Sequence, residues 1–305
     1  MKRAIITGGT GAIGTALIRK LISCNVEILV LVRKDSKRNI NIPKHPLIET
    51  KICDLNQLKE LQNDTKNKYD VFYHLGWSGT SGLERNDMYL QNRNVQYTLD
   101  AINVAKRFGC SVFVGAGSQA EYGRYEGILN ENVPSFPENG YGIAKLCAGQ
   151  MSRIECKKYG IKHIWARILS IYGPYDGKQT MISSTINKLL HGDIPSLTSC
   201  EQQWDYLYCD DAAKALYLLA EKGMDGKVYC IGSGKSQSLR KYVEIIKNKI
   251  DKNAVLGIGD IPYNENQVMY LCADISELQK DTGFEPEITF DEGIERTIAW
   301  MRKAK

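Results

Sequence analysis

AIITGGTGAIG (residues 4–14) is the strongest indication of fold class in this chain. It begins with apolar and β-branched residues, typical of a buried strand, and runs through a glycine-rich turn into the start of a helix. The glycine spacing suits a dinucleotide, because its pyrophosphate must approach backbone N–H groups where a Cβ atom would collide. We therefore expect this turn to bind cofactor phosphates through Gly8, Gly11, Ala12, Ile13 and Gly14.

Short apolar runs alternate with helical stretches through the first part of the chain. After residues 4–7, the sequence predicts strands at 27–32, 47–53, 71–75, 111–117 and 163–169, and helices at 12–23, 88–108 and 141–159. Apolar strands that alternate with helices indicate a parallel sheet covered on both faces. The sequence therefore predicts an α/β fold with a doubly wound, Rossmann-type parallel sheet.

The alternation weakens beyond residue 174. A helix with irregular chain is predicted in 177–204, a helix in 205–222 with a small strand, VYCIG, after it, and helices at SLRKYVEIIKNKI, 274–282 and 290–302. We expect a Rossmann domain at 1–174. A smaller substrate-binding lobe would come mainly from 175–305, with 205–250 partly returning to the first domain.

Composition limits the class of protein. The chain has 305 residues, 43% apolar and 25% charged, with a net charge of +5 scattered along its length. These values are ordinary for a globular protein and predict no nucleic-acid face. Nine cysteines occur without CxxC or zinc spacing, so we expect free thiols, no metal and a reducing cytoplasm. The run AIIT is too short for a signal peptide or a membrane span.

The end of the second predicted strand bears on the choice of cofactor. EILVLV runs directly into the basic segment 33–38, RKDSKR. An NAD site favours a carboxylate here, which binds the ribose 2′-OH, whereas a guanidinium pairs with the 2′-phosphate of NADP. We expect Arg33 and Lys34 to bind the cofactor and NADP to be preferred. Asp35 leaves NAD possible.

Ser118, Tyr141 and Lys145 form a candidate proton-transfer set. Tyr141 and Lys145 are four residues apart on a predicted helix, so their side chains share one face. A free tyrosine titrates at about 10, and a neighbouring ammonium favours its phenolate by about 2 to 3 pKa units. Ser118 can hold the reacting oxygen while Lys145 also binds the cofactor ribose. The set predicts hydride exchange between a nicotinamide and a carbinol or ketone carbon.

Further motifs resemble the extended short-chain dehydrogenase/reductase family of sugar-nucleotide epimerases, dehydratases and reductases. The resemblance covers nearly the whole chain and rests on CDL (53–55), YHLGW (73–77), NVQYTLDA (94–101), RILSIYGP (167–174), WDYLYCDDAAKAL (204–216), VYCIGSGKSQSL (228–239) and ADISELQKDTGFEPEITFDEGIERTI (273–298). It implies that Asp54 reaches the adenine. It also implies cofactor contacts at Leu55, Leu75, Gly76, Trp77, Asn94, Tyr141, Lys145 and Ile168.

Departures from the family pattern narrow the expected activity. Gln119 and Ala120 stand where water-eliminating members carry Asp-Glu, so dehydration is not expected. Val32 stands where NAD-holding epimerases have Asp. Ser170, Trp204 and Asn264 replace residues that usually hold the substrate diphosphate. The resemblance then implies a nucleotide sugar held differently, through Ser118, Gln119, Ala120, Ser170, Lys178, Gln202 or Gln203, and Trp204.

Three functions are compatible with these residues. The first is NADPH-dependent reduction of a nucleotide-linked 4-keto (deoxy)hexose, as in the 4-ketoreductases that GAGSQAEYG (115–123) resembles. The second is an NAD-dependent nucleotide-sugar 4-epimerase, which uses the same catalytic residues. The third, a non-catalytic dinucleotide sensor, does not need the Tyr/Lys pair. By analogy with the family we expect a homodimer formed through the helices at 88–108 and 141–159.

Overall fold

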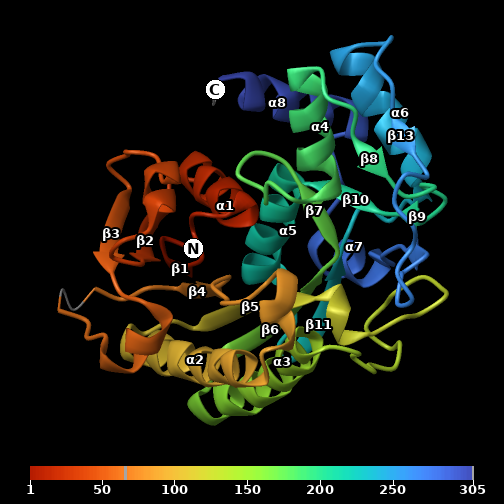
Figure 1. The fold of residues 1–305 in the computed structure, drawn as a ribbon. Coiled ribbons are helices and arrows are strands. Elements are labelled where there is room, and N and C mark those ends of the chain that lie inside the picture. Colours follow the sequence, from red (N-terminus) through yellow and green to blue (C-terminus); the bar gives the residue numbers. More distant parts are fainter. Residues whose placement is uncertain (65–66, 304–305) are drawn as a thin grey trace.

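The fold is seen in a computed structural model that describes residues 1–64 and 67–303 (Figure 1). A seven-stranded sheet, with all neighbouring strands parallel, has the order β11-β6-β5-β4-β1-β2-β3. Its strands are β1 (Arg3–Thr7), β2 (Glu27–Val32), β3 (Ile48–Ile52), β4 (Val71–His74), β5 (Val112–Ser118), β6 (Lys162–Ile168) and β11 (Lys227–Ile231). The strand order reverses between β1 and β4, which is where an open α/β sheet binds its ligand. The predicted doubly wound fold is confirmed.

Helices cover both faces of this sheet (Figure 1). On one face α1 (Ala12–Ser23) packs against α5 (Cys209–Lys222). On the other, α2 (Met88–Arg107) packs against α3 (Gly140–Tyr159). Neighbouring strand residues point to opposite faces, so Ile6 lies in one apolar core with Leu17 of α1, and Ile5 lies in another with Ala105 of α2. Most of these strands are therefore largely apolar, which allowed them to be predicted from the sequence, whereas β3 (IETKI) carries exposed Glu49 and Thr50.

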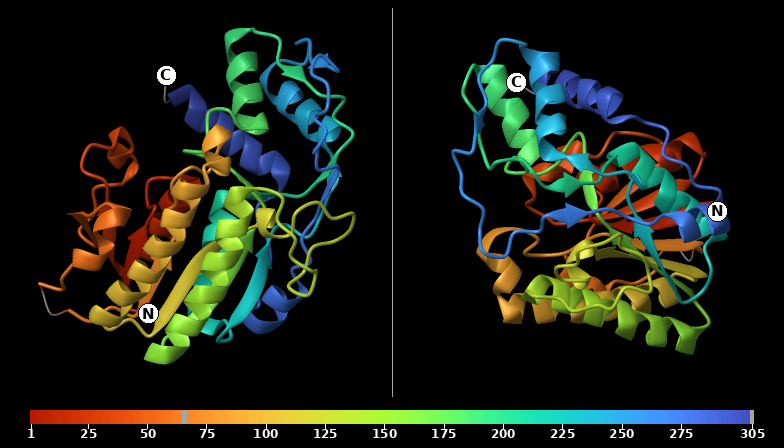
Figure 2. Two further views of the ribbon diagram at one scale, coloured as in Figure 1. Left: turned by 60° about the horizontal axis from the view of Figure 1, so that its bottom comes forward. Right: turned by 90° about the vertical axis from the view of Figure 1, so that its right-hand side faces the viewer.

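The remaining helices and short strands lie beyond one end of the main sheet or beside it (Figure 2). Helix α6 (Leu239–Ile250) packs between α4 (Met181–His191) and α8 (Phe290–Lys303), while α7 (Ser276–Thr282) packs on α5. Short strands pair as β7 (Ser170–Tyr172) with β10 (Tyr206–Tyr208), β8 (Ser196–Leu197) with β13 (Gly257–Ile258), and β9 (Gln203–Trp204) with β12 (Gln237–Ser238) and β14 (Tyr270–Leu271). The described residues also form four short 3-10 helices: η1 (Lys37–Asn41), η2 (Leu55–Glu60), η3 (Gly82–Asn86) and η4 (Gln119–Glu121).

One detail differs from the sequence-based expectation. The helix expected from residue 205 begins at Cys209, because Tyr206–Tyr208 pair with β7 as a strand. The small strand expected at VYCIG, β11, is the outermost strand of the main sheet, paired with β6. The division into a Rossmann domain and a substrate lobe remains a proposal, and its last residues, 304–305, lie outside the described residues.

The cysteines are free, and seven of the nine are buried; Cys24 is half-buried and Cys147 exposed. Within residues 1–64 and 67–303, no group of three His, Cys, Asp or Glu side chains could hold a metal ion. None of the helices in this described part combines the length and hydropathy required to cross a bilayer.

Candidate active site and cofactor cavity

The glycine-rich turn between β1 and α1 is shaped by close backbone contacts. Gly8 has a φ of 72°, and a Cβ there would lie 2.6 Å from the carbonyl carbon of Leu75. A Cβ on Gly14 would lie 2.2 Å from Gly8 O. At Gly11 a Cβ would meet no atom closer than Arg38 Nη2, at 3.8 Å. Gly8 and Gly14 are thus needed because a side chain there would collide with neighbouring backbone. At Gly11 the absence of a side chain leaves the backbone N–H accessible to a ligand.

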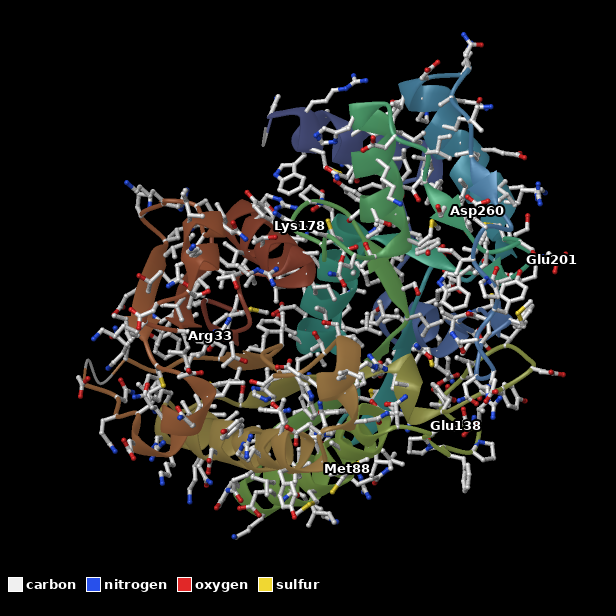
Figure 3. All side chains as sticks on the ribbon, in the orientation of Figure 1. Arg33, Met88, Glu138, Lys178, Glu201 and Asp260 are labelled. Carbon is white, nitrogen blue, oxygen red and sulfur yellow. The ribbon has the colours of Figure 1, made fainter. Side chains whose placement is uncertain are left out.

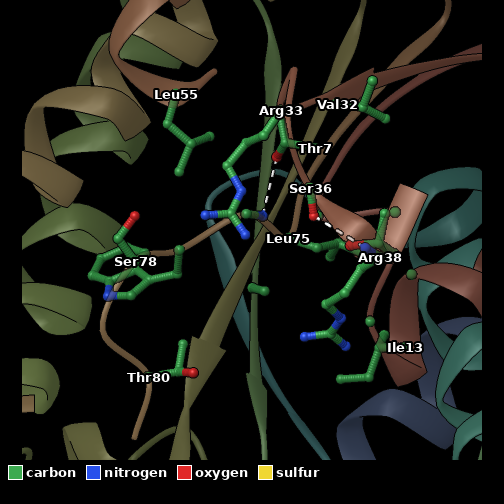
Figure 4. A pocket seen from close by; sticks show the side chains of 18 of the residues that line it. Thr7, Ile13, Val32, Arg33, Ser36, Arg38, Leu55, Leu75, Ser78 and Thr80 are labelled. Carbon is green, nitrogen blue, oxygen red and sulfur yellow. Dashed lines mark hydrogen bonds between the residues drawn. The ribbon is translucent and has the colours of Figure 1, made fainter. Parts of the chain in front are cut away.

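A cavity of about 720 Å³ opens beside this turn at the ends of β1, β2 and β4 (Figure 4). Its volume is within the usual range for small-molecule sites. Thr7 Oγ1 accepts a hydrogen bond from Gly76 N–H at 3.1 Å and fixes the cavity floor. Most residues predicted to bind the cofactor line the cavity: Gly8, Gly11, Ala12, Ile13, Gly14, Arg33, Asp54, Leu55, Leu75, Gly76 and Trp77. The residues present therefore fit a dinucleotide.

The basic segment after β2 forms one wall of the cavity (Figure 4). Arg33, Ser36, Arg38 and Asn39 all line it, and Arg38 Nη2 donates a hydrogen bond to Tyr175 O at 3.1 Å. The buried Asn39 Oδ1 has no hydrogen-bond partner within the described part of the chain. Ser36, Arg38 and Asn39 were not singled out from the sequence, although the basic run contained the signal.

Lys34 lines a second cavity, of about 570 Å³, together with Arg33, Arg38 and Asp54. Asp54 also accepts a hydrogen bond from Leu55 N–H at 2.7 Å, which begins the helix η2. The two cavities share four lining residues, Arg33, Ser36, Arg38 and Asp54. Basic side chains and two carboxylates, Asp35 and Asp54, therefore line the cavity where β2 ends.

Two further predicted cofactor residues are buried in the surrounding framework. Asn94 accepts a hydrogen bond from Ser78 N–H and donates one to Ser78 O, both at 2.9 Å. It therefore fixes the turn that carries Trp77. Ile168 is buried at the last position of β6, where it pairs with Ser118 of β5.

Ser118, Tyr141 and Lys145 converge in the structure. Ser118 is the last residue of β5, and Tyr141 lies in the first turn of α3, where its phenol hydrogen-bonds the Ser118 side chain. Lys145, one turn further along α3, donates from Nζ to Ala116 O at 2.6 Å. Its Nζ lies 3.8 Å from the Trp77 ring centroid and 5.7 Å from that of Tyr141. A strand end and one helix face therefore bring together groups that are 27 residues apart in sequence.

The pKa shifts of Tyr141 and Lys145 differ from the sequence-based expectation. Burial lowers the pKa of Lys145 to about 7, with the Glu121 carboxylate acting in the opposite direction. Burial raises the pKa of Tyr141, while the Ser118 hydrogen bond and the positive charge of Arg85 lower it. We expected Lys145 to lower the Tyr141 pKa. Instead its ammonium is held by Ala116 O and the Trp77 ring, and the cation that acts on the phenol is Arg85.

A buried ion pair between Glu121 and Arg167 contacts the backbone of Ser118. Glu121 is fully buried and accepts a hydrogen bond from Ser118 N–H at 2.8 Å. Its carboxylate pairs with Arg167 at 2.8 Å and accepts the indole N–H of Trp165 at 3.0 Å. Sequence reasoning missed Glu121, because nothing local shows that η4 turns its side chain inward under Ser118.

The predicted substrate residues fall into three groups. Gln119 and Ala120 follow Ser118 in η4, and Ser118 Oγ accepts the Ala120 N–H at 3.2 Å. Trp204, next to Gln203 in β9, donates its indole N–H to Ser170 Oγ at 2.7 Å. Lys178 is exposed in the segment before α4 (Figure 3). The neighbouring Gln202, named as an alternative to Gln203, is buried.

The chain is similar to known proteins along most of its length. A sequence model of the NAD-dependent epimerase/dehydratase family matches residues 4–232. A putative UDP-glucose 4-epimerase from Methanocaldococcus jannaschii is 29% identical over 306 residues, covering 98% of each chain. A dTDP-4-dehydro-6-deoxyglucose reductase from Escherichia coli is 27% identical over 318 residues, covering 98% of this chain and 97% of its own.

A solved structure shows the same fold. The UDP-N-acetylglucosamine 4-epimerase from Methanobrevibacter ruminantium, in complex with UDP-N-acetylmuramic acid, superposes with a TM-score of 0.90 at 22% identity. The superposition covers 100% of this chain and 99% of that one. The family match spans most of the chain, including the glycine-rich turn and Ser118, Tyr141 and Lys145. This protein therefore belongs to the NAD-dependent epimerase/dehydratase family, the extended short-chain dehydrogenases/reductases that act on nucleotide sugars, and is an oxidoreductase of that type.

Proposed function

We propose that this protein uses NADPH to reduce a nucleotide-linked 4-keto (deoxy)hexose to the corresponding deoxysugar nucleotide. The observation that carries the proposal is the basic wall of the cavity, where Arg33, Ser36 and Arg38 surround the end of β2. A reductase consumes its reduced cofactor at every turnover, so it must exchange NADPH from the cell. An epimerase regenerates its NAD and has no need for a phosphate site.

The physical basis for NADP is charge complementarity. Two guanidinium groups and a hydroxyl can hold a 2′-phosphate through charge-assisted hydrogen bonds. NAD offers only a ribose 2′-OH at that point, which a carboxylate recognises better. Here the last residue of β2 is Val32, so the strand itself ends without a carboxylate.

The proposed roles of the other residues follow from their geometry. When bound, the reduced nicotinamide supplies hydride to the carbonyl carbon. Tyr141 would deliver its phenolic proton to the carbonyl oxygen, and the Ser118 hydroxyl would hold that oxygen as negative charge develops on it. Lys145, now bonded to Ala116 O, would turn to the cofactor ribose. With Gln119 and Ala120 beside Ser118, η4 offers no acid–base pair for loss of water.

A 4-epimerase is the second candidate, supported by the M. jannaschii relative, whereas the E. coli reductase supports the first. Both reactions use the same Ser118, Tyr141 and Lys145. They differ in net redox change, since epimerisation consumes no cofactor. The cofactor balance therefore distinguishes them.

The experiment combines the protein and NADPH with 4-keto-6-deoxyhexoses carried on dTDP, CDP or GDP, and follows loss of reduced-nicotinamide absorbance. We expect stoichiometric NADPH consumption with one of these sugars and formation of a deoxyhexose. In a parallel reaction, UDP-glucose and NAD are tested for conversion to UDP-galactose. Interconversion of the UDP sugars without net NADPH consumption would establish the epimerase instead.

We also propose a homodimer formed through α2 and α3. The outer face of α3 carries an exposed stripe of Ile143, Cys147, Met151 and Ile154 at helical spacing. Apolar side chains in such a row are a common feature of protein interfaces. Light scattering on the purified protein measures the mass of the assembly directly.

A further inference from the structure

The turn between β4 and α2 packs on the beginning of α3. Within it, η3 (Gly82–Asn86) places the Asn86 side chain so that Oδ1 accepts the Gly140 N–H at 3.0 Å. A Cβ on Gly140 would lie 3.0 Å from Arg85 O, so the two backbones are in close contact. Arg85 Nη1 donates to Thr80 O at 3.0 Å, which fixes the guanidinium within the turn. Residues 80–86 thus pack against the first turn of α3.

The guanidinium of Arg85 lies over the ring of Tyr141. Its Cζ is 4.3 Å from the ring centroid, well inside the range of a cation–π contact. The Tyr141 ring also makes an edge contact with Trp77, whose ring centroid is 6.1 Å away at an interplanar angle of 83°. Tyr141 is therefore enclosed by an arginine from η3 and a tryptophan from the turn after β4.

Two charged groups act on the phenol, Arg85 from η3 and Glu121 from η4, while the Lys145 ammonium on α3 lies 5.7 Å from the ring centroid. A hydrogen bond with Ser118, from the end of β5, completes its surroundings. Because burial lowers the pKa of Lys145 to about 7, the lysine is partly neutral at neutral pH before the cofactor binds. An arginine stays protonated throughout this range. Arg85 is thus the permanent cation next to Tyr141.

We propose that Arg85 is a positioning residue of the reaction centre: its guanidinium holds the Tyr141 ring against Ser118 and stabilises the phenolate that remains after proton transfer. The inference rests on the proposed role of Tyr141 as proton donor. In the transfer, the phenolic O–H bond breaks and the proton passes to the substrate oxygen, which leaves negative charge on Tyr141. A cation over the ring favours that charged product.

The direct test measures the titration of Tyr141 itself, independently of any substrate. Protein labelled with [13Cζ]tyrosine is titrated by NMR in the presence of NADP⁺, and the resonance missing from a Tyr141→Phe sample identifies Tyr141. We expect Arg85→Gln to raise the Tyr141 pKa by about half a unit to one unit, because a half-exposed cation within 4–6 Å is removed. Arg85→Lys keeps the charge and should restore most of the shift. Arg302→Gln removes an exposed arginine from α8 and controls for loss of one charge.

Enzyme kinetics give a second measurement with the same variants. In the direction of alcohol oxidation, which requires the phenolate, kcat/KM rises with pH. For Arg85→Gln this rise should move to higher pH by the same amount and reach a plateau near that of the wild type. A purely structural defect would lower kcat/KM about equally at every pH. An unchanged Tyr141 titration in Arg85→Gln would overturn the inference. Full activity of Tyr141→Phe would instead overturn the proposed function.

Discussion

Glu121 and Arg167 form an ion pair, 2.8 Å apart, and Glu121 also accepts the backbone N–H of Ser118 at the end of β5. Both side chains are buried, Glu121 completely. Because water cannot replace a missing partner there, loss of one charge leaves the other unpaired in a low-dielectric interior. The pair therefore holds the end of the strand that carries Ser118 in place, and the stability of the fold depends on both residues.

We predict that Glu121→Gln lowers the free energy of unfolding by about 3 to 5 kcal/mol, the usual cost of breaking a buried pair from one side. Urea denaturation measures the change. Glu138→Gln is the matched control, because it breaks a similar Arg–Glu pair, with Arg124 at 2.9 Å, on the exposed surface (Figure 3). There we expect a cost below about 1 kcal/mol. Equal costs for the two variants would contradict the assignment of a buried, dehydrated pair.

Lys145 should make the stability of the unliganded protein depend on pH. Its pKa is about 7 in the folded chain and returns to its ordinary, higher value on unfolding. Between these values the unfolded chain binds more protons than the folded one, so stability rises with pH and is lost as pH falls toward 7. The slope from this group approaches about 1.4 kcal/mol per pH unit. Unfolding free energies of wild type and Lys145→Met, compared from pH 7 to pH 9.5, measure it. Parallel curves would show that Lys145 does not titrate in this window.

Tyr141→Phe keeps the ring between Arg85 and Trp77 and removes the transferable proton. We expect kcat to fall by at least about 100-fold, with cofactor affinity nearly unchanged. Steady-state kinetics and calorimetric titration of NADP⁺ test the two parts separately. A variant that kept most of its turnover would remove Tyr141 from the mechanism.

Arg33→Ala tests the choice of cofactor. NADPH binding should weaken by about 1.5 to 3 kcal/mol, the scale of a charge-assisted hydrogen bond, with NADH affinity nearly unchanged. Arg38 lines the same wall and remains in this variant, so residual preference for NADPH is expected. Equal weakening of both cofactors, or a wild type that prefers NADH, would favour the epimerase.

The framework of this protein could be predicted from its sequence because the signals are local. The helix at 12–23 and the strand at 27–32 were predicted with the bounds that the structure has, since a glycine-rich turn precedes the helix and five consecutive apolar residues follow Glu27 in the strand. The contacts of Arg85 and Glu121 could not be predicted in this way. Arg85 meets Tyr141 across 56 residues of chain, and Glu121 meets Arg167 across 46, so only the folded sheet brings them together.

Transfer of isotope from cofactor to sugar tests the central claim most directly. NADPH carrying deuterium at the reactive C4 position of the nicotinamide is incubated with the protein and the 4-keto-6-deoxyhexose nucleotide that supports turnover. The mass of the product is then measured by mass spectrometry. The reductase account predicts one deuterium per product molecule, located at sugar C4, for each NADPH consumed. A product without deuterium, or an epimerised sugar formed while the labelled NADPH stays intact, would contradict it.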